Sequence, residues 1–401
     1  MQTIHCQLCR QHQWSIVTQV EFGLWAEHAD ELERDSQSYA IGECLHCHHV
    51  QMMHPYDQSL FSKLYFHAQQ EAVMWHEDLR DSLLPYQQMI VFFQPYLPEQ
   101  AVIADFGCGT GALLNAIQQS ALSTSALIGI DFNNRCNTQQ MTYLSADLND
   151  LTGLPTDLWP QGIHLATASH VLEHLIDPVF FLNEVGKHLA ENGLLFLEVP
   201  DFSKPLAYDI SGLSNLVNLQ HIHYFTADSL TALATACGYQ LLAMQQLLTG
   251  YIPRLQVVLQ KSASELEPHP IINNAAEAVR QNVQSGVLKR QQFAKELQLQ
   301  SDSGHKVGLW GIGADFYLLV RDNPAILQLC QQGKCQLFDY QLATKSCFGQ
   351  QIHSSTAIAQ LDYPIYLTPL LAETRVKMHQ AAANWPATIR DPFMLSNVEA
   401  V

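Results

Sequence analysis

Short apolar runs alternate with helical patterns through the middle of the chain. Buried strands are predicted for four runs, at 101–106 (AVIADF), 126–131 (ALIGID), 163–169 (IHLATAS) and 194–200 (LLFLEVP). Helices are predicted between them at 111–120 and 177–190, with Pro178 near the start of the second and Gly193 as its stop. This alternation predicts a doubly wound α/β domain. The segment 255–261 is expected to close its sheet.

Similar patterns flank this central region. A helical lead-in is predicted at 70–98 from apolar residues at helical spacing: Trp75, Leu79, Leu83, Leu84, Met89, Ile90 and Phe93. After a polar linker at 261–270, a Gln-rich helix is expected at about 272–299, followed by a strand–turn–helix that begins at Lys306. Further strands at 335–340 and 363–369 indicate a second, smaller α/β domain.

Composition narrows the class of protein. The 401 residues allow two or three domains, and an apolar content of 47% supports real cores. A net charge of −18 without a basic stripe argues against a nucleic-acid partner. No apolar run approaches the roughly 20 residues of a membrane span, and the start of the chain does not resemble a signal peptide. The ten cysteines then indicate thiols and metal ligands, and a cytoplasmic location is expected.

Two C-x2-C turns stand out near the start of the chain. They contain Cys6, Cys9, Cys44 and Cys47, with 34 residues between the turns. Structural Zn(II) takes four thiolate or imidazole ligands in a closed tetrahedron, so these cysteines predict a structural zinc in a small N-terminal module. Ordinary reduced thiols are the alternative, and three nearby imidazoles are lower-ranked competing ligands: His46, His48 and His49.

A glycine loop, DFGCGTG at 105–111, connects the first central strand to its helix. Glycines let the backbone approach a ligand, and the helix N-terminus behind the loop favours an anionic group. Dinucleotide enzymes prefer G-x-G-x-x-G, whereas position 112 here is alanine. Asp131 ends the next strand, 20 residues after Gly111, where a carboxylate can accept hydrogen bonds from both ribose hydroxyls. A purely structural turn is the alternative.

This loop resembles the first motif of class I S-adenosylmethionine-dependent methyltransferases, D/E-x-G-x-G-x-G. The resemblance implies that S-adenosylmethionine is the cofactor and that Gly107 and Gly109 face its methionine part. The cofactor-binding residues that it implies are Asp105, Gly107, Gly109, Gly111, Asp131, Asp147 and Ser169. Asp147 matches the acid that lies beside the adenine amine in that family, although Asp150 is a second choice in the same stretch.

The whole arrangement resembles a narrower family, the zinc-containing sugar C-methyltransferases, which act on nucleotide-linked 4-keto deoxysugars. The similarity covers nearly the whole chain and includes the GLWGIGA turn at 308–314, although a turn that binds nothing is equally compatible with its glycines. It implies a zinc-binding module at 1–67, a Rossmann-like methyltransferase core at 68–262 and a Rossmann-like α/β domain at 271–401. The implied chemistry removes a proton beside a ketone and methylates the resulting enolate carbon, with no metal in the reaction.

That family carries its base in a Tyr-x-Glu-His stretch. His221 matches the histidine, whereas Asn218 replaces the tyrosine and Gln220 the glutamate, so no carboxylate next to His221 in sequence can orient it. His174 matches a second polar position near the acceptor, with His170 a weaker candidate. Tyr65 matches a tyrosine at the substrate entrance. Each of these side chains could instead have an ordinary structural role.

The favoured function is therefore methyl transfer to a carbon of a nucleotide-linked keto-deoxysugar. O- or N-methylation of another small metabolite is the alternative, and a cofactor-binding module without catalysis is a third possibility. The expected partner is a small molecule, neither nucleic acid nor membrane, and the sequence does not predict the oligomeric state. His223 should point away from His221 if this stretch is extended.

Overall fold

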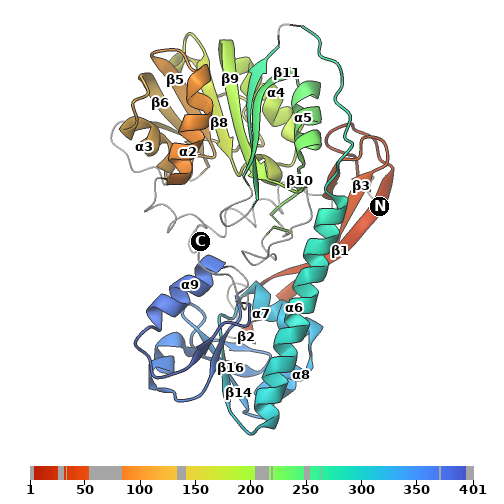
Figure 1. Cartoon of the computed structure of the whole chain (residues 1–401), viewed down its shortest axis with the longest axis vertical. Helices are drawn as coiled ribbons and strands as arrows, with labels where there is room; N and C mark the ends of the chain where they lie inside the picture. Colours follow the sequence, from red (N-terminus) through yellow and green to blue (C-terminus); the bar gives the residue numbers. More distant parts are fainter. Residues whose placement is uncertain are drawn as a thin grey trace. The chain divides into compact units, whose positions relative to one another are not determined.

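A computed structural model provides the structure of the chain (Figure 1). It describes residues 4–25, 31–32, 34–53, 84–132, 141–203, 216–217, 220–247, 253–262, 264–369 and 372–393. The chain folds into two compact units, and each unit is built from separate segments of the chain. The first contains Met1–Val17, Ala40–Lys204 and Gln220–Ala278, and the second contains Thr18–Tyr39, Pro205–Leu219 and Val279–Val401.

The first unit contains a seven-stranded sheet in the order β11-β12-β9-β8-β5-β6-β7. Its strands are β5 (Ala101–Phe106), β6 (Thr124–Asp131), β7 (Thr142–Ser145), β8 (Ile163–Ser169), β9 (Leu189–Pro200), β11 (Tyr239–Leu247) and β12 (Arg254–Lys261). The five from β9 to β7 are parallel, whereas β12 pairs antiparallel with β9 and β11. The central strand β5 (AVIADF) is a nearly continuous hydrophobic run because both of its faces are covered, whereas β7 (TYLS) at the edge is partly exposed.

Helices cover both faces of this sheet, which confirms the predicted α/β class. On one face, α2 (Leu84–Phe93) and α3 (Ala112–Gln119) share a core with Ile103 and Phe196. On the other face, α4 (Pro178–His188) and α5 (Ala227–Ala236) share a core with Phe106.

Two predictions about this sheet were wrong in detail. The segment 255–261 does not close the sheet, because β11 pairs with β12 and takes the edge position. The helix after Pro178 ends at His188, and Gly193 lies inside β9 instead of ending the helix. The pairing of β9 with β8 shifts register between Leu189 and Leu194, so an irregularity of the strand occupies the place where a helix end was expected.

A smaller four-stranded sheet carries the N-terminal cysteines. Its order is β1-β3-β4-β10, with β1 at Trp14–Trp25, β3 at Arg34–Cys44, β4 at Val50–Met52 and β10 at His223–Tyr224. The antiparallel pairing of His223 with Gln51 and of Tyr224 with Val50 joins the cysteine region to a segment more than 170 residues further along the chain. This pairing places the cysteine turns in the first compact unit.

The second unit contains another seven-stranded sheet, in the order β18-β17-β13-β14-β16-β15-β2. Its strands are β2 (Glu31–Leu32), β13 (Val307–Trp310), β14 (Cys335–Asp339), β15 (Ser346–Cys347), β16 (Gln350–Ser354), β17 (Ile365–Leu367) and β18 (Ile389–Arg390). The residues of β2 pair in parallel with β15, although more than 300 residues separate them in sequence.

The helices of the second unit also cover both faces of its sheet. One core combines α6 (Ala276–Asp302), α7 (Ala314–Asp322) and α8 (Ala325–Gln331) with β13, β14 and β16. The other combines α9 (Ala372–Ala381) with β13 and β17. The expected second α/β fold is therefore present, although its sheet also takes in β2 from the N-terminal part of the chain.

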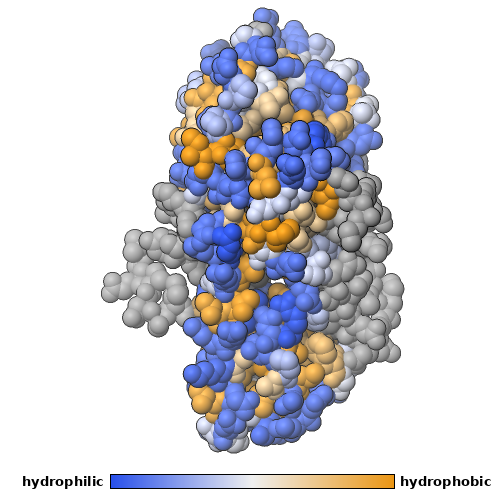
Figure 2. Space-filling view, turned by 90° about the vertical axis from the view of Figure 1, so that its right-hand side faces the viewer, coloured by the Kyte–Doolittle hydropathy of each residue, from blue (hydrophilic) through white to orange (hydrophobic). Residues whose placement is uncertain are grey.

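The surface in Figure 2 shows separate hydrophobic patches set among hydrophilic residues. Several large apolar side chains of the first unit are exposed, including Val91 at 69% and Ile272 at 86%. Among the described helices, none combines the length and apolar character needed to cross a membrane.

Candidate active site

The carboxyl ends of β5 and β8 lie side by side and carry the predicted chemistry. From β5 the sheet continues to β6 on one side and to β8 on the other. In open α/β sheets, such a reversal of strand order opens a crevice where ligands bind. The glycine loop follows β5, and the short 3-10 helix η5 (Leu172–His174) follows β8. A side chain at Gly107 would collide with Cγ2 of Val171, so the two segments lie in contact.

The glycine loop has the backbone conformation that its sequence predicts. Gly107, Gly109 and Gly111 all adopt positive φ, at 79°, 53° and 79°. Other residue types rarely adopt this region, so glycine is required here for conformational reasons. Gly111 is also the N-cap residue of α3 and has no side chain that could cap the helix.

Asp131 and Asp105 have different environments although both end strands. The backbone N–H of Gly109 donates to Oδ2 of Asp131 at 2.9 Å, which ties the loop to the end of β6. The hydroxyl of Thr167 donates to Oδ1 of Asp105 at 2.7 Å within the sheet. Burial raises the pKa of Asp105 to about 7, and the Thr167 hydroxyl only partly offsets this effect.

Asp147 and Ser169 are the remaining residues that were predicted to bind the cofactor. In the loop after β7, Oδ1 of Asp147 accepts from the backbone N–H of Asn149 at 2.9 Å. The amide oxygen of Asn149 accepts from Ile176 N–H, which holds this loop against the segment after η5. The neighbouring choice, Asp150, is exposed. Ser169 donates its hydroxyl to Glu198 Oε1 at 3.0 Å, at the end of β8.

An imidazole–carboxylate cluster lies directly after β8. Glu173, His174 and His221 each offer one ligand-type atom, and these atoms all lie within 4.8 Å of one another. The rings of His174 and His221 meet edge to face, with centroids 4.7 Å apart. The cluster thus brings together His221 and His174, which were predicted from sequence, and Glu173, which was not.

Electrostatics set the protonation states in this cluster. Burial opposes a charge on His170, but hydrogen bonds to Glu173 and Glu198 outweigh it and raise the pKa of His170 to about 10. Burial also disfavours the Glu173 carboxylate, yet the surrounding imidazoles, led by His174, lower its pKa to about 2. Burial lowers the pKa of His174. At neutral pH, Glu173 is therefore ionised, His170 is protonated and His174 is neutral.

The tautomer of His174 follows from its hydrogen bond. Its Nδ1 lies 3.0 Å from the carbonyl oxygen of Gln220, and a carbonyl oxygen can only accept. The proton of the neutral ring is therefore on Nδ1, and Nε2 carries a lone pair. In this state His174 can accept a proton at Nε2 but cannot donate one from that nitrogen.

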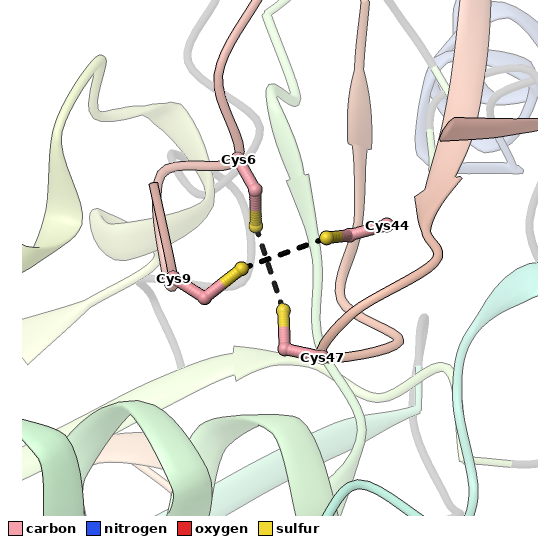
Figure 3. A group of neighbouring side chains, drawn as sticks. All are labelled: Cys6, Cys9, Cys44 and Cys47. Atoms are coloured by element: carbon pink, nitrogen blue, oxygen red, sulfur yellow. Dashed lines mark hydrogen bonds between the residues drawn. The ribbon is translucent and has the colours of Figure 1, made fainter. Parts of the chain in front are cut away.

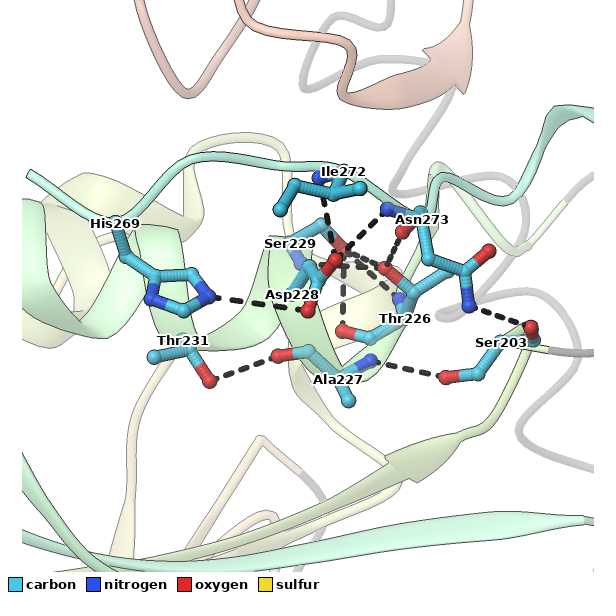
Figure 4. Close-up of polar contacts among 9 residues, drawn as sticks. All are labelled: Ser203, Thr226, Ala227, Asp228, Ser229, Thr231, His269, Ile272 and Asn273. Atoms are coloured by element: carbon cyan, nitrogen blue, oxygen red, sulfur yellow. Dashed lines mark hydrogen bonds and ion pairs between the residues drawn. The ribbon is translucent and has the colours of Figure 1, made fainter.

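The segment that carries His221 is held on two sides. On one side, Ile222 donates its N–H to the Glu173 carbonyl and accepts from Met52 N–H, each at 2.8 Å. On the other, Thr226 and Ser229 form a capping box at the start of α5 (Figure 4). Asn273 donates from Nδ2 to the Ser203 carbonyl and accepts from the Thr226 hydroxyl in the same network. His221 is thus a buried side chain, only 7% exposed, on a segment fixed by backbone bonds.

The four cysteines of the N-terminal turns converge on one point (Figure 3). Cys6 Sγ lies 3.6 Å from Cys47 Sγ, and Cys9 Sγ lies 3.5 Å from Cys44 Sγ. A tetrahedral zinc with bonds of about 2.3 Å needs sulfurs about 3.8 Å apart. The donor set therefore fits a zinc ion that accepts no further ligand.

Two neighbouring histidines have structural partners instead of joining the cysteines. Nε2 of His49 lies 3.1 Å from Nδ1 of His223, and Nε2 of His223 lies 3.0 Å from the Leu175 carbonyl. His48 pairs with Glu43 at 2.7 Å. These contacts link the cysteine region to the end of η5. Tyr65 and Asn218 lie outside the described residues, so the predicted role of Tyr65 stays a prediction.

A family model described as a methyltransferase domain matches residues 75–244, which contain both the glycine loop and the imidazole cluster. The chain is a methyltransferase enzyme that uses S-adenosylmethionine. No curated protein matches the chain.

Several solved methyltransferases are similar in structure. An S-adenosylmethionine-dependent methyltransferase from Mesorhizobium loti has 18% identity and a TM-score of 0.35, and the match covers 43% of this chain and 96% of that one. The 1,6-didemethyltoxoflavin-N1-methyltransferase of Burkholderia thailandensis has 13% identity and a TM-score of 0.40, with 56% and 96% covered. An Archaeoglobus fulgidus methyltransferase has 14% identity and a TM-score of 0.37, with 47% and 98% covered.

Replacing Asp131 with alanine should weaken S-adenosylmethionine binding by about 10- to 100-fold, because it removes the hydrogen bonds predicted between this carboxylate and the ribose. Such charge-assisted hydrogen bonds contribute about 1.5–3 kcal/mol. Asp157→Ala is the matched control, since its carboxylate is exposed and it is not among the residues predicted to bind the cofactor. Calorimetric titration measures both variants. Equal affinity in Asp131→Ala and wild type would contradict the ribose assignment, and tight NAD binding would contradict the class of cofactor.

Proposed function

We propose that this methyltransferase alkylates a carbon next to the ketone of a nucleotide-linked deoxysugar, with His221 as the base. One observation carries the proposal. His221 is buried against a second imidazole and a carboxylate, next to η5, and η5 follows the strand adjacent to the glycine loop. Proton removal from a carbon acid needs such a base near the methyl donor.

The cofactor would lie across the crevice between the ends of β5 and β8. The loop of Gly107, Gly109 and Gly111 would take its methionine part, Asp131 its ribose and Asp147 its adenine. Bound S-adenosylmethionine supplies an electrophilic methyl group. The positive φ of the three glycines and the bond between Gly109 and Asp131 support this placement.

The chain's own residues would handle the proton. His221 would take the α-proton of the acceptor on a ring nitrogen. His174 has its lone pair on Nε2 and its burial-lowered pKa keeps it neutral, so it would accept a hydrogen bond beside the acceptor. Tyr65 is proposed at the substrate entrance from the sequence resemblance alone.

The zinc would have no part in the reaction. Four thiolates complete its shell, and the cysteine turns are joined to β4, which pairs with β10 beside His221. We therefore propose that Cys6, Cys9, Cys44 and Cys47 hold a structural zinc that stabilises the edge of the acceptor site.

O-methylation is the second candidate. The observation that favours it is Gln220, which occupies the position where the sugar C-methyltransferases have a glutamate. A hydroxyl proton is easier to remove than a carbon-bound one, so a less activated histidine would suffice for an oxygen acceptor.

Hydrogen exchange distinguishes the two candidates. With S-adenosylhomocysteine and a TDP-4-keto-6-deoxysugar in D2O, we expect deuterium to enter the carbon beside the ketone faster than in buffer alone. NMR of the sugar measures this exchange, and His221→Ala should abolish the enzymatic part. Exchange at the buffer rate, together with methyl transfer to a hydroxyl, would contradict carbon alkylation.

A further inference from the structure

The carboxylate that the base lacks in sequence is present in space. The residue before His221 is the neutral Gln220, but the Glu173 carboxylate reaches to within 4.8 Å of a His221 ring nitrogen. Glu173 comes from η5, almost 50 residues earlier in the chain. The bond from Ile222 N–H to the Glu173 carbonyl, at 2.8 Å, joins the two backbones next to these side chains.

The Glu173 side chain is buried and only partly satisfied. It is 1% exposed, and its Oε1 lies 3.1 Å from Nδ1 of His170. Its other oxygen, Oε2, is buried without a hydrogen-bond partner. An unpaired buried polar atom costs about 1–3 kcal/mol, and more for a charged group, so this oxygen is set to gain a donor in some state of the enzyme.

We propose that Glu173 is a positioning residue for His221, and that its carboxylate stabilises the imidazolium formed when His221 removes the acceptor's proton. This inference rests on the proposed function for its place in catalysis. The proton moves from the acceptor carbon to a His221 nitrogen, and the electron pair stays on the acceptor as an enolate. The new carbon–carbon bond then forms as the carbon–sulfur bond breaks, and the imidazolium finally returns its proton to solvent.

The charges around Glu173 are compatible with this role. His170, held between Glu173 and Glu198, partly compensates the two carboxylates, with Nε2 3.4 Å from Glu198 Oε1. His174, whose Nε2 lies 3.7 Å from Glu173 Oε1, is neutral and adds no charge at neutral pH. His174 and His170 contribute most to the lowered pKa of Glu173, and His221 adds a smaller attraction, which by the same coupling favours the charged form of the His221 imidazole.

The first test needs no acceptor. The titration of the His221 ring is followed by NMR in wild type and in Glu173→Gln. Because the carboxylate favours the imidazolium, its removal should move the midpoint to lower pH. Glu198→Gln is the comparison variant. The Glu198 carboxylate interacts with the cluster through His170, so its removal should shift the midpoint of the His221 titration less. An unchanged midpoint in Glu173→Gln would overturn the pairing, whatever reaction the enzyme catalyses.

The second test is kinetic and uses the TDP-4-keto-6-deoxysugar. Glu173→Gln should lower kcat by about 10- to 100-fold, the effect of an opposite charge at this range, with little change in KM. The acid limb of kcat/KM should move to lower pH, because the base loses its proton more easily. A purely structural defect would lower activity without moving this limb, and such a result would overturn the proposal.

A carboxylate introduced at a different position should partly rescue the Glu173→Gln variant, which makes the test specific to the charge. Gln220→Glu places a carboxylate next to His221 in sequence, so adding it to Glu173→Gln should restore part of the lost kcat and return the acid limb toward wild type. Melting temperature and calorimetric S-adenosylmethionine binding confirm that each variant is folded. A second metal ion per chain that disappears in Glu173→Gln would overturn the proposal in favour of a cation site. If no sugar reacts while the NMR midpoint shifts, the proposed function fails and the pairing stands.

Discussion

Replacing His221 with alanine should lower turnover by about 10²- to 10⁴-fold, the usual contribution of general acid–base catalysis. The affinity for S-adenosylmethionine should not change, because the described contacts of His221 are with η5 and not with the glycine loop. Steady-state kinetics and calorimetric titration on the same preparation measure the two effects. A variant with normal turnover, or one that loses cofactor binding in proportion to activity, would show that His221 is not the base.

His223→Ala is the matched control for this variant. Its ring is 1% exposed, donates from Nε2 to the Leu175 carbonyl and accepts at Nδ1 from His49. It does not belong to the Glu173 cluster. Burial lowers the pKa of His223 to about 4, so the ring is neutral at working pH. We expect a lower melting temperature with most of the activity of the folded fraction retained.

Replacing Cys9 with serine should abolish binding of the proposed zinc and, with it, most of the activity. Structural zinc sites bind with about 10–16 kcal/mol, and that free energy supports folding. Cys44 ends β3, and β4 begins three residues after Cys47 and pairs with β10, two residues after His221. Loss of the metal should therefore loosen the support of the base.

Elemental analysis, melting temperature and turnover, measured on the same preparations, report the loss of zinc, of stability and of activity. Cys237→Ser is the control, since Cys237 lies at the end of α5 and outside the four-cysteine cluster. We expect one zinc per chain in wild type and in the control. A fully folded, active Cys9→Ser protein without zinc would refute the structural role.

The inner parallel strands β5, β6, β8 and β9 were predicted from the sequence, whereas the short edge strand β7 was not. The bounds of β5 and β8 agree with the predicted runs at 101–106 and 163–169, because both strands are buried on two faces and contain few polar residues. In β11, YQLLAMQQL, polar residues interrupt the pattern and much of the strand is only half-buried, as an edge position allows. Local periodicity does not reveal such a strand.

Pairings between distant segments were not predictable in the same way. Residues 31–32 join the second sheet through β15, and residues 223–224 join the cysteine sheet through β4. Two-residue strands carry no periodic signal, so their positions depend on tertiary contacts alone.

The candidate site was predicted where residues act close together in sequence. The glycine loop and the four cysteines belong to local motifs, and their conformation and convergence agree with the predictions. The sequence does not single out Glu173, because its 48-residue separation from His221 hides their proximity. The spacing of His170, Glu173 and His174 was the available signal, but only the structure shows that the same carboxylate also faces His221.

The turn at Gly311–Gly313 bears on one alternative that the sequence left open, a turn that binds nothing. Gly311 N–H donates to the Phe338 carbonyl, and Ile312 N–H donates to Asp339 Oδ2 at 2.8 Å. The other Asp339 oxygen accepts from two further backbone N–H groups, at Gln341 and Leu342. Asp339 is therefore occupied by its own loop, which favours a structural turn.

The product of a labelled reaction shows whether the methyl group is transferred to carbon. The protein is incubated with S-adenosylmethionine carrying a ¹³C-methyl group and a panel of 4-keto nucleotide sugars, and products are analysed by mass spectrometry and ¹³C NMR. We predict a product heavier by one labelled methyl group, with that carbon bonded to the carbon next to the ketone. A labelled methyl group on oxygen or nitrogen would contradict the account.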